Sequence, residues 1–268
     1  MTNPLIGTSW KMNLTASEAD GWFRAFVPLV ADLTDRELFV LPPFTAIWVA
    51  RERLRGSAIA WGAQDVHPDD EGAHTGDVSA PMLADLGCRY VEVGHSERRR
   101  DHGETPTLIG AKLRAILRWG MTPLLCVGET AEAPVEVAAP LVLADLEACL
   151  ASLPAPDVGR IVVAYEPAWA IGVGAIAAPA ARVGAVQRLL ADSLLGRAEG
   201  RPPRILYGGS VDEAAAGRLL AEPGVDGLFV GRYALDPERF ARIARAGLGP
   251  PPEPGHAVGR DNVEGRAR

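Results

Sequence analysis

Eight short apolar runs recur along the chain, and the longer segments between them have the spacing of amphipathic helices. The runs are almost continuously hydrophobic instead of alternating with polar residues, which is typical of parallel strands covered on both faces. Repeated units of a strand followed by a helix indicate a parallel sheet. The eight runs span residues 4–10, 37–41, 58–63, 89–93, 122–127, 160–165, 204–207 and 227–230.

Helix boundaries can be placed between these runs. Thr15 and Glu18 have the spacing of a capping box, in which the two side chains satisfy the first backbone amides of a helix. Gly120 stands where a glycine ends a helix, and Pro179 stands where the next long helical segment begins. Helices are therefore expected to alternate with the strands.

Strands and helices in this order fit a closed barrel or an open, doubly wound sheet. The even number of strands favours the barrel, as does the absence of a Gly-x-Gly-x-x-Gly loop after the first strand. We expect an α/β fold with one domain, a (β/α)8 barrel over residues 1–246. A chain of 268 residues with 48% hydrophobic content can form one such core. Residues 247–268 are rich in proline, glycine and charge, which predicts a disordered tail without a catalytic role.

The composition restricts the possible partners and compartments. A net charge of -7 and a pI near 5.3 argue against a nucleic-acid partner. The chain has no membrane-length apolar stretch, and Cys88, Cys126 and Cys149 lack the spacing of a disulfide framework or a metal site. We expect a cytoplasmic protein without a metal or membrane partner, in which local positive groups attract any anionic substrate.

Polar residues follow several of the predicted strands. In a βα barrel the active site forms at the carboxyl ends of the strands, so these positions are the candidates for chemistry. They are Lys11 after the first strand, His95 after the fourth, Glu166 after the sixth, Gly208, Gly209 and Ser210 after the seventh, and Gly231 and Arg232 after the eighth.

Four segments at these strand ends resemble the signature motifs of the triosephosphate isomerase family. They are SWKMN at residues 9–13, GHSERR at 94–99, AYEPAWAIG at 164–172 and YGGSV at 207–211, in the order and at the spacing of that family. Residues 72–77 and 126–130 also resemble family segments, so that the match runs from about residue 5 to residue 245. The resemblance implies a TIM barrel and an isomerase of glycolysis and gluconeogenesis.

The resemblance implies three catalytic roles. Moving a carbonyl group to the neighbouring carbon requires a base for a C–H proton and stabilisation of the enediolate oxygen. Glu166 matches the family's base, and His95, flanked by Ser96, matches a neutral imidazole that donates a hydrogen bond to the oxygens. Lys11 matches the positive charge near the phosphate and the oxyanion, and Glu97 is expected to hold its ammonium. No cofactor is required, because the proton stays within reach of one carboxylate.

The resemblance also implies a phosphate site and a mobile lid. Backbone N–H groups of Gly209 and Ser210, together with Gly231, would bind the phosphate, and Tyr207 and Gly208 would support this loop. Gly172 and Gly174 in the sixth loop would complete the site when the lid closes. Its hinges would be residues 167–169 and residues 175–177, where Ala-Ile-Ala departs from the family's usual sequence.

Two substrate-lining positions also depart from the family. Ser9 stands where asparagine is usual, and Arg232 stands where a second glycine is usual. Ser9 lacks an amide donor, and Arg232 adds a bulky cation beside the phosphate region. These changes are similar to a branch of the family that acts on erythrulose phosphates in tetritol catabolism. The sequence leaves a three-carbon and a four-carbon substrate open.

Other readings of the sequence concern catalysis and assembly. A nucleotide-binding enzyme is disfavoured by the missing phosphate fingerprint, and a non-catalytic barrel that binds sugar phosphates is disfavoured by the presence of all three catalytic residue types.

The resemblance further implies a homodimer. The loop that begins at Gly72 and ends at Asp77 would insert into the neighbouring subunit, where Thr75 would brace the partner's Lys11.

Overall fold

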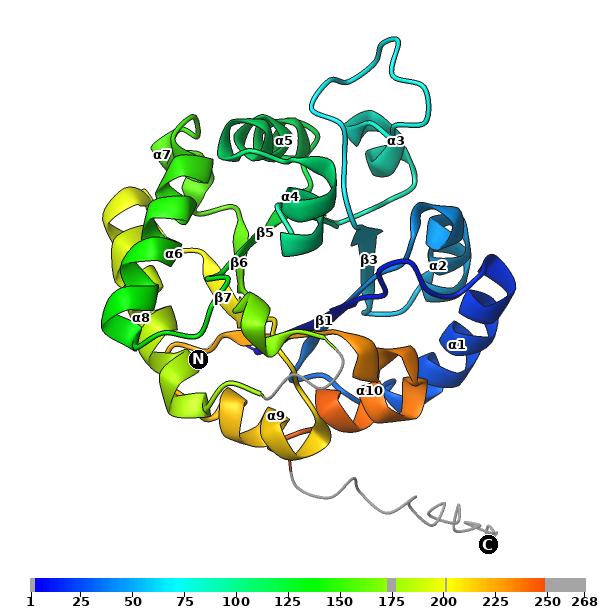
Figure 1. Cartoon of the computed structure of the whole chain (residues 1–268). Helices are drawn as coiled ribbons and strands as arrows, with labels where there is room; N and C mark the ends of the chain where they lie inside the picture. The colour runs from blue at the N-terminus through cyan, green and yellow to red at the C-terminus, as the bar shows by residue number, and fades with distance from the viewer. Residues whose placement is uncertain (1–2, 173–176, 201, 249–268) are drawn as a thin grey trace, which may run out of the picture.

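Eight parallel strands close into a barrel in which each strand pairs with its sequence neighbours and β1 pairs with β8 (Figure 1). The computed structural model describes residues 3–172, 177–200 and 202–248. The predicted α/β barrel is confirmed. The strands are β1 Leu5–Ser9, β2 Glu37–Leu41, β3 Ala60–Ala63, β4 Tyr90–Val93, β5 Thr122–Val127, β6 Val162–Tyr165, β7 Arg204–Tyr207 and β8 Gly227–Val230.

The strand bounds agree closely with the predicted apolar runs. β2, β5, β7 and β8 have the predicted bounds. β1 is one residue shorter at each end, and β3, β4 and β6 begin one or two residues later than predicted. The apolar pattern extends beyond the strands, because flanking residues such as Trp10 and Ile161 are buried although they lie outside β1 and β6. The pattern therefore reports burial, and burial extends slightly beyond the sheet.

Helices surround the barrel and cover the outer faces of its strands (Figure 1). The capping box is present, because Thr15 and Glu18 each accept a hydrogen bond from the other's backbone amide. Gly120 has a φ of 74°, and Pro179 is the N-cap of α8. The helices are α1 Ala16–Leu29, α2 Ile47–Leu54, α3 Ala80–Asp85, α4 Ser96–His102, α5 Pro106–Arg118, α6 Val135–Leu150, α7 Ala155–Val158, α8 Ala180–Arg197, α9 Glu213–Leu220 and α10 Pro237–Ala244.

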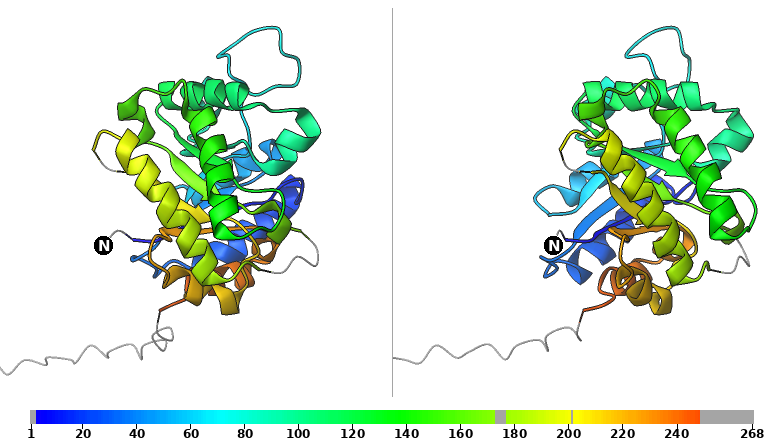
Figure 2. Two further views of the ribbon diagram at one scale, coloured as in Figure 1. Left: turned by 60° about the vertical axis from the view of Figure 1, so that its left-hand side comes forward. Right: turned by 90° about the vertical axis from the view of Figure 1, so that its left-hand side faces the viewer.

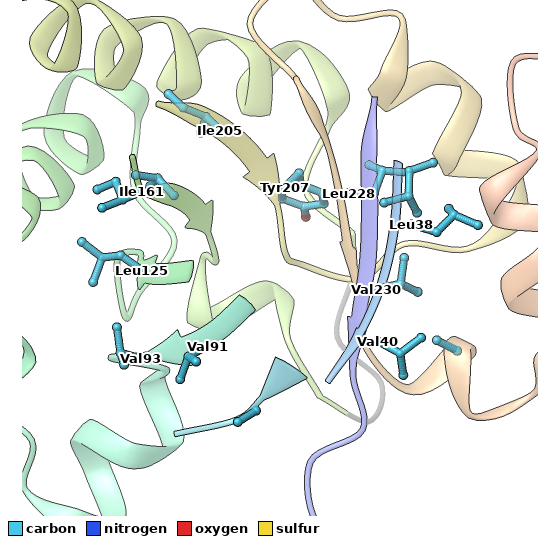
Figure 3. Close-up of a cluster of buried hydrophobic side chains, with 14 of the residues drawn as sticks. Leu38, Val40, Val91, Val93, Leu125, Ile161, Ile205, Tyr207, Leu228 and Val230 are labelled. Carbon is cyan, nitrogen blue, oxygen red and sulfur yellow. The ribbon is translucent and has the colours of Figure 1, made fainter. Parts of the chain in front are cut away.

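The strands bury both faces, as the continuous apolar runs predict. One set of side chains fills the barrel interior, where the Phe39 ring packs against Tyr90 and Phe229. The alternate positions pack against the helices, and Figure 3 shows part of this layer. Gly7 lies beside Phe39, and a Cβ atom at position 7 would stand 2.1 Å from that ring. The barrel interior is thus a packed core, and the polar groups lie at the carboxyl ends of its strands.

Two segments differ from the barrel pattern. The loop that joins β3 to α3 projects away from the barrel in Figure 1 and Figure 2. At the C-terminal end, Gly247 and Leu248 belong to the part of the chain that the structure describes, although the sequence analysis assigns them to the tail. Leu248 packs on the core and its amide donates to the Arg245 carbonyl. The rest of the predicted tail lies outside the described residues.

Candidate active site

A cavity of about 580 Å³ opens at the carboxyl ends of the strands. Within the described part of the chain, every residue predicted to be catalytic or to bind substrate lines this cavity. Of the residues predicted to support the catalytic and phosphate-binding groups, Thr75 and Tyr207 do not line the cavity. The predicted residues that line the cavity are Ser9, Lys11, His95, Ser96, Glu97, Glu166, Gly172, Gly208, Gly209, Ser210, Gly231 and Arg232.

Lys11 is held by its backbone and by an ion pair. Its φ of 53° lies in the left-handed region, which costs energy for a residue with a side chain and is often found at functional sites. The Gln64 side-chain amide donates to the Lys11 carbonyl at 3.1 Å. The Lys11 ammonium donates to Glu97 Oε1 at 2.7 Å, so the expected contact is present. Burial by itself would raise the pKa of Glu97, but the hydrogen bond and the charge of the Lys11 ammonium lower it, and the pKa lies below its ordinary value.

His95 lies at the N-terminus of α4, where its side chain caps the helix. Nδ1 accepts a hydrogen bond from the Glu97 backbone amide at 3.1 Å, so in the neutral ring the proton is on Nε2. Burial lowers the pKa of His95 to about 4, and the Lys11, Arg100 and Arg98 cations also lower it, against the opposing effect of Glu97. His95 is therefore a neutral donor at physiological pH.

Glu166 follows β6 and is buried against the imidazole. The backbone amide of Glu166 donates to the Val127 carbonyl at 2.8 Å, and Oε2 lies 3.4 Å from His95 Nε2. Oε2 is buried and makes no hydrogen bond to any residue that the structure describes. Burial raises the pKa of Glu166 well above its usual range, and Glu92 raises it further, whereas Lys11 opposes this rise. The carboxylate is thus a strong base.

Glu92 is an acidic group at the floor of the cavity that the sequence analysis does not single out. It lies on the inner face of β4 and is 2% exposed. Burial raises the pKa of Glu92 to about 7, while hydrogen bonds from Ser9 and Cys126 and the charge of Lys11 lower it. The signal in the sequence is an acid inside the apolar run YVEV, at a position where strands of this kind carry apolar residues.

The loops after β7 and β8 form the opposite wall. A Cβ atom at position 209 would stand 2.1 Å from the Tyr207 hydroxyl, so only glycine fits there. The Ser210 amide donates a hydrogen bond to the Ala170 carbonyl at 3.1 Å, so in this conformation it does not point its N–H group at a phosphate. The Arg232 guanidinium donates to the Gly172 carbonyl at 3.2 Å, which joins the β8 loop to the lid.

The N-terminal end of the predicted lid contacts a third buried acid, Glu129. Glu129 accepts hydrogen bonds from the Tyr165 hydroxyl, the Trp169 indole and the Arg182 guanidinium at 2.9 to 3.1 Å. The sequence marks Glu129 within a family-like segment but assigns it no contact, because its partners lie up to 53 residues away. Of the predicted lid residues, Gly174, Ala175 and Ile176 lie outside the described residues.

The loop from Gly72 to Asp77 is exposed throughout. It includes Thr75 and belongs to the segment that projects from the barrel (Figure 1). The ring of His74 in this loop packs against the ring of His67, with ring centroids 3.9 Å apart and the planes tilted by 31°. Thr75 therefore lies in a surface loop and does not line the cavity of the chain to which it belongs.

Three comparisons relate this chain to known proteins. The sequence model of the family described as triosephosphate isomerase matches residues 4–247. The triosephosphate isomerases of Roseiflexus castenholzii and Thermus thermophilus are 43% and 44% identical, over 91% of this chain and 97% and 99% of theirs. The crystal structure of triosephosphate isomerase from Bartonella henselae superposes with a TM-score of 0.78 at 34% identity, covering 91% of this chain and 98% of that one.

The family match spans the whole barrel, and the relatives are aligned along nearly their entire length. The pocket that the motifs predict is also formed, with Lys11, His95 and Glu166 on its wall. In the part of the chain that the structure describes, no helix is long and apolar enough to cross a membrane. On its sequence, its fold and its site, the chain belongs to the triosephosphate isomerase family.

Proposed function

We propose that the protein is an aldose-ketose isomerase that interconverts dihydroxyacetone phosphate and glyceraldehyde 3-phosphate through an enediolate. One observation carries the proposal beyond family membership. An imidazole Nε2 and a buried carboxylate oxygen lie 3.4 Å apart in one pocket with the Lys11 ammonium, although the three residues are far apart in the sequence. A base, a neutral donor and a cation are the groups that this proton transfer requires.

The geometry assigns each group a step. The Glu166 carboxylate removes a proton from the hydroxyl-bearing carbon beside the carbonyl and returns it to the former carbonyl carbon. The hydroxyl proton must also move to the former carbonyl oxygen, so the neutral imidazole of His95 gives its Nε2 proton to that oxygen and takes up the hydroxyl proton in its place. His95 donates its Nε2–H to the oxygens on which negative charge develops. Lys11, fixed by Glu97, stabilises the same charge and the phosphate. The fixed groups need little reorganisation during the reaction.

Phosphate binding is assigned to the wall formed by the loops after β7 and β8. Gly209 and Gly231 bring backbone close to the cavity, and the exposed Arg232 supplies a cation. The Ser210 amide would have to exchange its Ala170 partner for a phosphate oxygen. That exchange would couple phosphate binding to movement of the lid segment that carries Ala170.

A four-carbon ketose phosphate is the second candidate substrate. Ser9 and Arg232, the two positions that depart from the family pattern, both line the cavity. Ser9 lies beside Glu92, so the floor offers polar atoms to an additional hydroxyl group. The relatives compared above are triosephosphate isomerases, and the three-carbon substrate therefore comes first.

The test is a comparison of turnover on dihydroxyacetone phosphate and on the two erythrulose phosphates with one purified sample. The proposal expects kcat/KM to be highest for the three-carbon substrate. In the S9N/R232G double variant, the ratio of three-carbon to four-carbon turnover should rise about tenfold if these positions set substrate length. Binding of all three compounds without turnover would instead support a non-catalytic barrel.

We further propose that residues 1–246 form one catalytic domain of a cytoplasmic enzyme of glycolysis and gluconeogenesis. A homodimer is proposed from the exposed loop between Gly72 and Asp77, with Thr75 of each subunit reaching toward the partner's Lys11. Light scattering at several concentrations tests the assembly, and a deletion of residues 73–76 should yield a monomer. A natural protein that remains monomeric at high concentration would remove this proposal.

A further inference from the structure

Glu92 lies directly beneath the proposed base. Carboxylate oxygens of Glu92 and Glu166 and the Cys126 Sγ atom all lie within 4.8 Å of one another. Cys126 Sγ lies 3.7 Å from Glu92 Oε1, and all three side chains are buried. Two carboxyl groups thus line the cavity beside a buried thiol, and the mechanism above uses only the carboxyl group of Glu166.

The surroundings supply little positive charge to this pair. Lys11, which faces it from the end of β1, is already bonded to Glu97 on α4. His95 is held neutral, and Cys126 on β5 keeps its proton because burial raises its pKa well above its ordinary value. The negative charge of Glu97 instead raises the pKa of both carboxyl groups further.

Two buried carboxyl groups this close cannot both ionise at moderate pH, because each charge disfavours the other and water does not screen them. They titrate as a unit, and one proton is shared between them. An apolar residue would fill the β4 position at lower cost, since burying an ionisable group is unfavourable. A merely structural role therefore does not explain Glu92.

We propose that Glu92 is a positioning residue of the isomerase site, which shares a single negative charge with Glu166 and thereby sets the pH at which the base becomes ionised. The inference rests on the proposed function and deepens it. When Glu92 carries the charge, Glu166 keeps its proton and cannot act as a base. Glu92 therefore acts through Glu166 and contacts no reacting atom.

The first experiment is the pH profile of kcat/KM for the natural protein and for E92Q. Glutamine keeps the size and polarity of the side chain but cannot hold the charge. Without that charge the pKa of Glu166 falls, and the acid limb of the profile should move to lower pH by one unit or more. On that limb, kcat/KM of E92Q should be about tenfold higher than that of the natural protein. Ionisation of the substrate phosphate is common to both proteins and cancels in the comparison.

An acid limb at the same pH for both proteins would overturn the proposal. Glu92 would then be an uncharged side chain that only fills space in the core. E92L serves if E92Q folds poorly, because it also removes the charge and should shift the limb in the same direction. A second variant, C126S, keeps both carboxyls and should leave the acid limb within about half a unit of its natural position. Thermal unfolding of each variant confirms that it is folded.

Infrared spectroscopy separates this proposal from the proposed function. The difference spectrum of natural protein minus E92Q near pH 6 should contain the band of a protonated carboxyl group, whether or not the protein turns over a substrate. Its absence would mean that the substitution removes no protonated carboxyl group, which contradicts charge sharing. An inactive natural protein that shows the band would disprove the isomerase function and the positioning role, while the shared proton would stand.

Discussion

Gly208 lies directly against the side chain of Glu166. A Cβ atom at position 208 would stand 2.5 Å from Glu166 Cγ and 2.7 Å from Oε1. The glycine therefore keeps open the space in which the carboxylate reaches the cavity. It acts by its lack of a side chain, since its own backbone amide is bonded to the Tyr165 carbonyl at 2.9 Å.

We expect G208A to lower kcat by about a hundredfold, because displacing a reacting group by about 1 Å can have an effect of this size. Steady-state kinetics with the preferred substrate measures it. G217A is the matched control, since a Cβ atom there would come no closer than 3.7 Å to its neighbours and the site lies within α9. The control should keep its kcat and gain about 0.5 to 1 kcal/mol of stability. Equal kcat values for G208A and the natural protein would contradict this account.

The ion pair between Lys11 and Glu97 should matter for chemistry more than for stability. Both side chains are partly exposed, at 32% and 42%, so the pair adds little to the free energy of unfolding. E97Q should nevertheless lower kcat about tenfold, because the ammonium would lose its fixed position near the developing charge. E213Q, which weakens the similarly exposed pair with Arg239, is the control and should not change kcat. An equal effect of both variants would argue against a role in placing Lys11.

The sequence predicts the barrel and the meeting of Lys11, His95 and Glu166 in one pocket, and the reasons are physical. Burial on both faces makes each strand visible as an apolar run, and the carboxyl ends of parallel strands meet at one rim, so Lys11, His95 and Glu166 are brought together by topology. The contacts of Glu129 and the bond from Arg232 to Gly172 depend on side-chain and loop geometry that no local pattern encodes. Glu92 did leave a local signal, a charged residue in an apolar strand.

Removing the buried charge of Glu92 should stabilise the fold at alkaline pH. The pKa of Glu92 rises from its ordinary 4.5 to about 7 in the folded protein, chiefly through burial. Between these values the unfolded chain is ionised while the folded state retains the proton, so stability decreases as pH rises through this window. E92Q should therefore unfold at a higher temperature than the natural protein at pH 8, with a smaller difference at pH 5. A difference in Tm that does not depend on pH would contradict the prediction.

His95 should produce the opposite dependence at acid pH. Its pKa falls from 6.5 to about 4 on folding, chiefly through burial. The unfolded chain takes up a proton below pH 6.5 that the folded imidazole refuses, so stability is lost as pH falls from 6.5 toward 4. The loss amounts to about 2 kcal/mol at pH 5. Urea unfolding at pH 8 and pH 5 measures it, and H95Q should lose correspondingly less stability between the two. The same loss in both proteins would assign the effect to other groups.

Shortening the base by one methylene tests the central chemical assignment. E166D keeps the charge but withdraws the carboxylate by more than 1 Å from the cavity, and the 3.4 Å approach to His95 Nε2 would lengthen. We expect kcat to fall about a hundredfold while KM changes little, because the lost interaction is made in the transition state. Competition by inorganic phosphate, measured in both proteins, should give the same inhibition constant, since the phosphate wall is untouched. An E166D variant that turns over at the natural rate would show that another group removes the proton.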